Sequence, residues 1–157
     1  MKAIPTSMLS NPIHLLSLGF GSGLSPKAPG TMGTVAALPL WCALQLLSPA
    51  TYIVVVAACF GLGVYLCGET ARALGVHDHG GIVWDEFVGL WVALFLTPFE
   101  PFWVLLGFAL FRLFDIWKPW PIRVLDAKVH GGLGIMVDDL LAGFYAFVVL
   151  QLLYLIP

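Results

Sequence analysis

The chain has 157 residues, of which 60% are hydrophobic and only 10% are charged. Soluble domains have about 45 to 50% apolar and about 25% charged residues, so a water-soluble globule of this composition could not cover its apolar surface. The formal net charge of −2 excludes the positive field that binds nucleic acid. The length allows one domain. We therefore expect residues 1–157 to form a single membrane-embedded domain, with 1–30 as an interfacial segment and glycine-rich loop and 31–157 as a helical bundle.

Five apolar runs follow one another along the chain, at residues 36–47, 51–67, 87–97, 102–114 and 140–156. Because a hydrocarbon core needs about 20 helical residues, the first two runs cross it if their flanks are counted, and the 48–50 turn makes them an antiparallel hairpin. The third and fourth are shorter and either cross with flanking residues or are partly re-entrant. The sequence predicts an all-α, polytopic helical membrane protein of about five spans, with four as the alternative.

The charged residues predict the orientation of these spans. With five spans, all seven Lys and Arg residues fall on one side, and Glu100 is the only charged side chain on the other. Cytoplasmic loops carry the excess of Lys and Arg. The N-terminus is therefore expected in the cytoplasm and the C-terminus outside, with the polar site at the cytoplasmic face.

Carboxylates gather on that same face, and two pairs are adjacent in sequence, Asp85-Glu86 and Asp138-Asp139. A single Asp at a helix start is often only an N-cap, but neighbouring acids repel and a helix start needs one cap. Carboxylates completed by water and a substrate phosphate are typical of magnesium. We therefore predict Mg²⁺ as the cofactor, with Glu69 and Asp115 as second choices for ligands. Zinc at His77 and His79 is disfavoured because no further histidine has matching spacing.

Residues 19–34 are rich in Gly, Ser and Thr and include Lys27. Glycines let backbone N–H groups approach an anion, and a helix N-terminus adds donors, so this segment is a candidate phosphate loop. It contains neither a Walker loop nor a dinucleotide fingerprint. The alternative is a flexible loop whose glycines permit close helix packing. The candidate phosphate-binding residues here are Ser22, Lys27, Thr31 and Thr34.

A third polar segment covers residues 112–123. Arg112, Asp115 and Lys118 are spaced three apart and share a helix face, which two prolines then end. Lys118 and Arg123 are further candidates for binding phosphate. The alternatives are that the cations meet anionic headgroups and that Trp117 and Trp120 are interfacial anchors.

The three motifs together resemble a known family. The runs GSGLSPKAPGTMGT (21–34), HDHGGIVWDEFVG (77–89) and FRLFDIWKPWPIRVLDAKVHGGLGIMVDDLLAG (111–143) are similar to those of phosphatidylglycerophosphatase A. The resemblance extends over almost the whole chain beyond residue 15. It implies a magnesium-dependent enzyme of the bacterial inner membrane that dephosphorylates phosphatidylglycerophosphate to phosphatidylglycerol, with a membrane phospholipid as its partner. The sequence indicates no obligate protein partner.

Other phosphatase chemistries lack their residues in this chain. The cysteine phosphatase loop, the D-x-D pair of aspartyl-phosphate enzymes and the histidine-nucleophile lipid phosphatase motif are all absent. By exclusion, the expected nucleophile is a water activated by the metal, with Lys and Arg neutralising the phosphoryl group. Metal and water are assigned to Asp85, Glu86, Asp138 and Asp139, one of which is the general base. His130 is a candidate acid for the leaving oxygen, or else a solvated loop histidine.

Three other functions stay open. A phosphatase of another glycerolipid monoester, such as phosphatidic acid, would use the same site. A small ion-coupled transporter would need acids inside its spans, whereas these acids gather at one face. A headgroup phosphotransferase would need a D-G-x-x-A-R signature, which this chain lacks.

Overall fold

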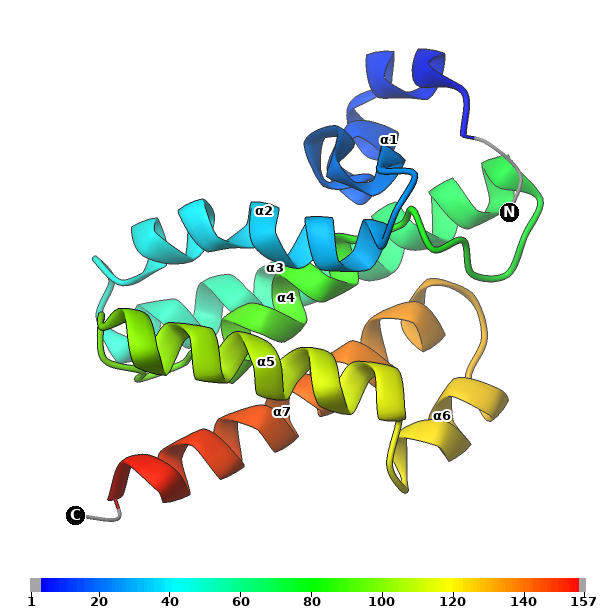
Figure 1. Ribbon diagram of the computed structural model, residues 1–157. Helices are drawn as coiled ribbons and strands as arrows, with labels where there is room; N and C mark the ends of the chain where they lie inside the picture. Colours follow the sequence, from blue (N-terminus) through cyan, green and yellow to red (C-terminus); the bar gives the residue numbers. More distant parts are fainter. Residues whose placement is uncertain (1–3, 156–157) are drawn as a thin grey trace.

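The computed structural model describes residues 4–155, and within that range the regular structure is entirely helical (Figure 1). Ile156, which ends the fifth apolar run, lies outside the described residues. The 3₁₀ helices are η1 (Thr6–Ser10) and η2 (Gly19–Leu24). The α-helices are α1 (Pro12–Ser17), α2 (Pro29–Leu44), α3 (Pro49–Leu74), α4 (Trp84–Ala93), α5 (Pro101–Trp117), α6 (Ile122–Lys128) and α7 (Gly131–Leu155).

Each of the five apolar runs contains a helix, although residues 45–47 and 94–97 fall outside α2 and α4, so the all-α prediction is confirmed for residues 4–155. Proline stands in the first turn of α2, α3 and α5, where its missing N–H would be unpaired in any case. Two of the helices, α3 and α7, are long and apolar enough to cross a membrane. The helices α2, α4 and α5 have 16, 10 and 17 residues. Among the described residues, length and composition therefore identify two candidate spans, fewer than the five expected.

The short helix α4 is the centre of the structure. Nine of its ten residues are buried, because α2, α3, α5 and α7 all pack against it. The helices α2 and α3 run in opposite directions, as expected (Figure 1). They do not pack closely against each other as a hairpin, however, and each packs instead against α4. The residues at the start of α4 are consequently enclosed by several helices.

The closest approach between α4 and α7 occurs at two glycines. A Cβ atom added to Gly143 would overlap the backbone carbonyl oxygen of Gly89, and one added to Gly89 would lie 2.8 Å from the carbonyl oxygen of Asp139. Small residues allow helix backbones to approach in this way. Asp85 and Asp139 each lie four residues before one of these glycines, about one helical turn. The crossing therefore brings the two acidic pairs of the sequence together.

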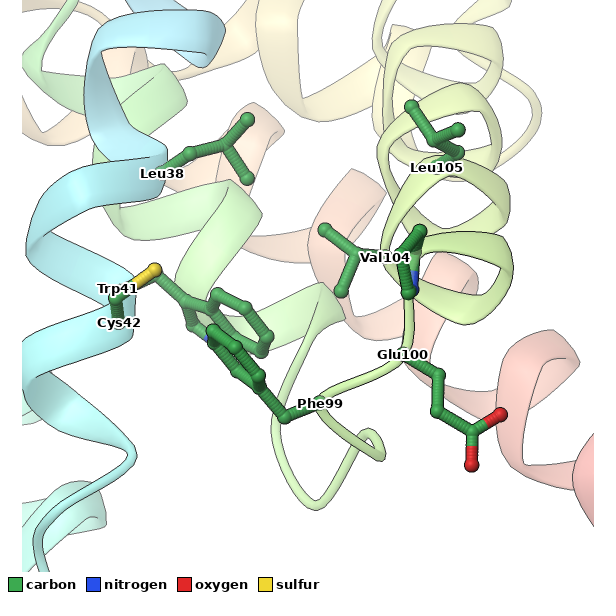
Figure 2. Close-up of a pocket in the computed structure, with 8 residues that line it drawn as sticks. Leu38, Trp41, Cys42, Phe99, Glu100, Val104 and Leu105 are labelled. Atoms are coloured by element: carbon green, nitrogen blue, oxygen red, sulfur yellow. The ribbon is translucent and has the colours of Figure 1, made fainter.

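The C-terminal ends of α2 and α4 are apolar. The Trp41 ring stacks on Phe99 with centroids 5.6 Å apart, beside a cavity of about 350 Å³ that is otherwise lined by Leu38, Cys42, Glu100, Pro101, Val104 and Leu105. Figure 2 shows the Glu100 carboxylate pointing away from the two stacked rings. The polar groups described next are at the other end of α4.

Candidate active site

Three carboxylates meet between the first turn of α4 and the helix α7. One oxygen each from Asp85, Glu86 and Asp139 lies within 4.8 Å of the other two. These side chains, which we call the carboxylate cluster, belong to residues that are only 8%, 9% and 4% exposed. Burial of several like charges is costly unless a cation compensates them. The cluster therefore has the electrostatic character of a cation site.

One oxygen of each carboxylate in the cluster also lacks a hydrogen-bond partner among the described residues. Asp85 Oδ1, Glu86 Oε2 and Asp139 Oδ2 are buried and accept no hydrogen bond from any residue between 4 and 155. Buried polar atoms are nearly always hydrogen-bonded. Oxygen donors alone suit a hard divalent cation such as Mg²⁺. The residues present thus fit the predicted metal.

Helix capping does not explain these acids. The N-cap of α4 is Val83, and no side chain caps that helix. Asp138 and Asp139 lie seven and eight residues beyond Gly131, where α7 begins, whereas a cap serves N–H groups of the first turn. The capping alternative is wrong for Asp138 and Asp139. Asp85 and Glu86 do lie in the first turn of α4, where the helix dipole favours a negative charge.

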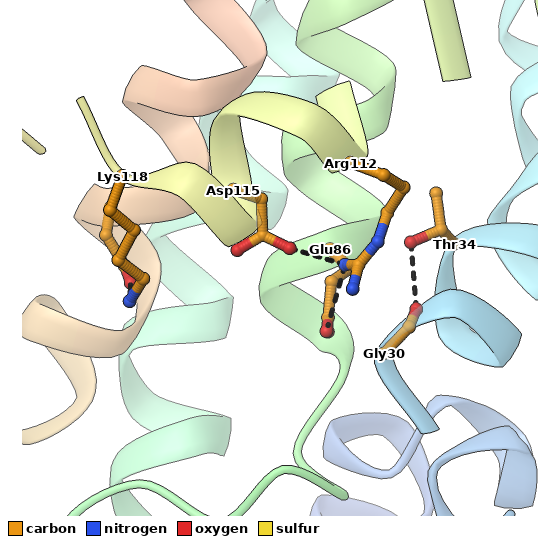
Figure 3. A network of polar contacts seen from close by, with 7 residues as sticks. Gly30, Thr34, Glu86, Arg112, Asp115 and Lys118 are labelled. Atoms are coloured by element: carbon orange, nitrogen blue, oxygen red, sulfur yellow. Dashed lines mark hydrogen bonds and ion pairs between the residues drawn. The ribbon is translucent and has the colours of Figure 1, made fainter. Parts of the chain in front are cut away.

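Arg112 of α5 is the cation nearest to the carboxylate cluster. Its Nη1 atom lies 2.5 Å from Asp115 Oδ2 and 3.6 Å from Glu86 Oε1, as Figure 3 shows. The Arg112 side chain is 15% exposed. Asp115 in turn is close enough to Asp139 for the two carboxylates to interact electrostatically. Asp115, a second-choice ligand from the sequence, therefore borders the cluster.

Arg112 is not among the candidate site residues predicted from the sequence. A signal for it exists, because Arg112 is the one cation inside the apolar run 102–114. A charged residue placed in an apolar helix faces the protein interior and marks a functional site by default. The three-residue spacing between Arg112 and Asp115 places the two side chains on one face of the helix but does not identify what Arg112 contacts.

The candidate phosphate loop reaches the site at one point, Gly30. A Cβ atom there would overlap Glu86 Oε1 and lie 3.1 Å from Arg112 Nη2, so the glycine lies directly against the ion pair, and a larger residue would require the Glu86 side chain to shift. Thr34 Oγ1 donates a hydrogen bond to the Gly30 carbonyl at 2.8 Å (Figure 3). The hydroxyl proton of Thr34 is therefore donated within α2 and not to a phosphate in this structure. Thr31 is half-buried in the same first turn.

The remainder of this segment is folded rather than a flexible loop. Ser22 Oγ donates to the Gly19 carbonyl at 2.8 Å, within η2. A Cβ atom on Gly23 would overlap the carbonyl oxygen of Gly81, so close packing explains that glycine, as the alternative interpretation expected. Lys27 is exposed and makes no ion pair within the described range 4–155.

Lys118 connects three helices beside the carboxylate cluster. Its Nζ atom lies 2.6 Å from Asp138 Oδ2 on α7 and 2.9 Å from Asp126 Oδ1 on α6. Burial lowers the pKa of Lys118, but the hydrogen bonds to these two carboxylates raise it more, so the net pKa lies above its ordinary value. The ammonium group therefore stays charged at neutral pH. Asp138 is the partner of Lys118 and is not one of the three clustered acids.

Three further candidates lie apart from the carboxylate cluster. Glu69 pairs with Arg72 at 2.7 Å on the surface of α3. The His130 ring makes an edge contact with His77, with centroids 4.9 Å apart. Arg123 is exposed on α6 and lines a separate pocket beside Lys118. The structure thus unites the two acidic pairs with Asp115 and Lys118, but not with these three residues.

Within residues 4–155 these features define an all-helical protein with two helices apolar enough to span a membrane and a buried, acidic, arginine-containing polar centre. The family model described as phosphatidylglycerophosphatase A matches residues 15–154, and the chain belongs to this family. No solved structure matches the chain.

Curated relatives agree with this assignment. The chain is 56% identical over 136 residues to a phosphatidylglycerophosphatase A of Escherichia coli strain K12, covering 86% of this chain and 79% of the relative. It is 53% identical over 143 residues to a protein of the same name from Haemophilus influenzae, covering 90% and 88%. A putative phosphatidylinositol-3-phosphatase of Bacteroides thetaiotaomicron is 39% identical over 144 residues, covering 87% and 89%.

Proposed function

We propose that this protein hydrolyses the terminal phosphomonoester of phosphatidylglycerophosphate, giving phosphatidylglycerol and inorganic phosphate. The observation that carries the proposal is the buried carboxylate cluster with Arg112 beside it, in a chain of the phosphatidylglycerophosphatase A family. A phosphomonoester is a dianion, so its hydrolysis requires positive charge around the phosphoryl oxygens and a group that accepts the proton of water. A cation held by the cluster and the Arg112 guanidinium would supply the positive charge, and a neighbouring carboxylate would accept the proton.

The carboxylates have separable roles in this proposal. Asp85, Glu86 and Asp139 hold a magnesium ion, because each contributes a buried oxygen that has no partner among the described residues. When bound, magnesium supplies a Lewis acid for the phosphoryl oxygens and lowers the pKa of water. Arg112 binds the phosphoryl group through its planar guanidinium. One of the neighbouring carboxylates accepts the proton of the attacking water.

We further propose a multi-pass arrangement in the bacterial inner membrane, with about five spans and the polar centre at the cytoplasmic face. Support comes from the packing of α4 against α2, α3, α5 and α7 and from the apolar surroundings of Trp41 and Phe99 at the other end of α4. Lys118, Arg123 and Lys128 all follow α5 on the side of the polar centre, where positive residues mark the cytoplasm.

A second candidate is the hydrolysis of a different lipid phosphomonoester. The Bacteroides relative is named for a phosphoinositide, although it is 39% identical over most of both chains. A protein similar to this chain over most of its length is therefore named for another headgroup. Phosphatidic acid is the simplest alternative of this kind, because its monoester is attached directly to diacylglycerol.

Phosphate release from purified protein in detergent micelles tests the proposal. The panel comprises phosphatidylglycerophosphate, phosphatidic acid, phosphatidylinositol 3-phosphate and soluble glycerol 3-phosphate, each with magnesium. We expect the fastest release from phosphatidylglycerophosphate and little from the soluble ester. Faster release from another lipid would favour the second candidate. Absence of release from every lipid would contradict phosphatase activity and favour a transporter.

A further inference from the structure

A pocket that the catalytic proposal does not use lies where the chain reverses between α5 and α6. Its volume is about 440 Å³, and it is lined by Trp117, Lys118, Pro119, Trp120, Arg123 and Val124. We call it the α5–α6 pocket. The two tryptophans are 68% and 79% exposed. Exposed indole rings beside cations are typical of protein surfaces at the level of lipid headgroups.

The α5–α6 pocket contains one uncommitted positive charge. Lys118 is bonded to Asp126 and Asp138, so its positive charge is already more than offset by its two carboxylate partners, and that group has a formal charge of −1. Arg123 is exposed and makes no ion pair with any residue of the described range 4–155. Its guanidinium has the planar arrangement of donors that binds two oxygens of one phosphate. The pocket is therefore suited to a singly charged phosphate group.

The α5–α6 pocket and the carboxylate cluster share a boundary. Lys118 lines the pocket, and its Nζ atom bonds Asp138, the residue next to Asp139. In Figure 3, Asp115 lies between Lys118 and Arg112 along the same stretch of α5. A ligand with two phosphates joined by a short linker could occupy both places.

Phosphatidylglycerophosphate has this chemistry. Its terminal monoester is a dianion, its internal phosphodiester carries a single negative charge, and one glycerol joins them. We propose that Arg123 in the α5–α6 pocket binds the internal phosphodiester while the terminal monoester is held at the carboxylate cluster and Arg112. This inference rests on the proposed function. It makes Arg123 a residue that distinguishes phosphatidylglycerophosphate from phosphatidic acid, which has no internal diester.

The test measures binding, so that it does not depend on turnover. Short-chain phosphatidylglycerol, which keeps the diester but lacks the monoester, is titrated calorimetrically into the protein in detergent. Short-chain phosphatidic acid, which has only the monoester, is the comparison ligand. We expect Arg123→Gln to weaken phosphatidylglycerol binding about ten-fold, the loss of one charge-assisted contact, with little change for phosphatidic acid. Lys128→Gln is the matched control, because Lys128 is an exposed cation on the same helix and does not line the pocket.

Several results would overturn the inference. Unchanged phosphatidylglycerol affinity in Arg123→Gln removes Arg123 from the binding site. An equal loss for both lipids, or the same loss in Lys128→Gln, shows a general effect of surface charge instead of a diester contact. Failure of the proposed function is seen separately, as absence of phosphate release from phosphatidylglycerophosphate by the unaltered protein.

Discussion

Gly143 of α7 lies directly against the backbone carbonyl of Gly89 of α4, so closely that no Cβ atom fits between them. This contact fixes the distance between the two helices one turn away from Asp85 and Asp139. A change in the contact therefore alters the geometry of the carboxylate cluster without touching any of its side chains.

We expect Gly143→Ala to lower phosphate release strongly, on the order of 10-fold or more, because the added methyl group must push α7 away from α4 and a small displacement of reacting groups is costly. The matched control is Gly61→Ala on α3, where an added Cβ meets nothing within 4 Å. Phosphate release and thermal unfolding of both variants check this. Equal activity in the two variants would mean that the glycine contact does not set the site geometry.

Removal of charge from the carboxylate cluster gives a second prediction. Asp85→Asn and Asp139→Asn keep the size of the side chain but lose the negative charge, so each should lower phosphate release about 100-fold, equivalent to about 2.7 kcal/mol of barrier. Glu100→Gln, an exposed carboxylate at the other end of the molecule, is the control. Near-normal rates in both cluster variants would place the reaction centre elsewhere.

A third prediction separates the two adjacent acids of α7. Chelation should abolish phosphate release, and added magnesium should restore it. The magnesium concentration for half-maximal rate should rise about ten-fold or more in Asp139→Glu, whose longer side chain displaces a ligand oxygen. It should change little in Asp138→Glu, because Asp138 is bonded to Lys118. Equal shifts in the two variants would contradict separate roles for these acids.

Arg112 provides a fourth prediction. Arg112→Lys keeps the charge but loses the forked guanidinium, so we expect a fall of about 10-fold in the rate, and Arg112→Gln should fall further. Thermal unfolding distinguishes a binding role from a structural one, since Arg112 also pairs with Asp115 at 2.5 Å. A rate that falls only in proportion to the folded fraction would make Arg112 a structural residue.

The membrane arrangement gives a fifth prediction. In the five-span topology, a reporter inserted near His79 is cytoplasmic and one fused after the last residue is periplasmic. Enzymatic reporters active on only one side of the membrane measure this directly. Detection of both positions on the same side would replace five spans with four or with a re-entrant arrangement.

The helical nature of the chain was predictable, because runs of apolar residues between turn residues give a strong signal. The central position of α4 could not be predicted from the sequence. Its residues 87–97 read as a short membrane span, whereas α4 ends at Ala93 and four other helices enclose it. Periodicity describes one helix at a time and contains little information on which helices surround it.

Within the site, the adjacent acids were recognisable because charge is rare in this chain. Their meeting depends on the Gly89 and Gly143 contact, a tertiary feature that no local pattern displays. Tertiary packing also gives Asp138 and Asp139 different roles in the site. They are neighbours in sequence but point to different partners, and only packing decides which of them faces Lys118.

Enclosure of α4 by four helices has a further consequence for how proteins of this kind can change during evolution. A substitution inside α4 must be accommodated by several tightly packed neighbours at once, so the carboxylate cluster, the proposed reaction centre, tolerates few alternatives. The exposed turn between α5 and α6 is under no such restriction, since Trp117, Trp120 and Arg123 face outward. New headgroup preferences can therefore arise at the rim while the chemistry at the centre is inherited unchanged.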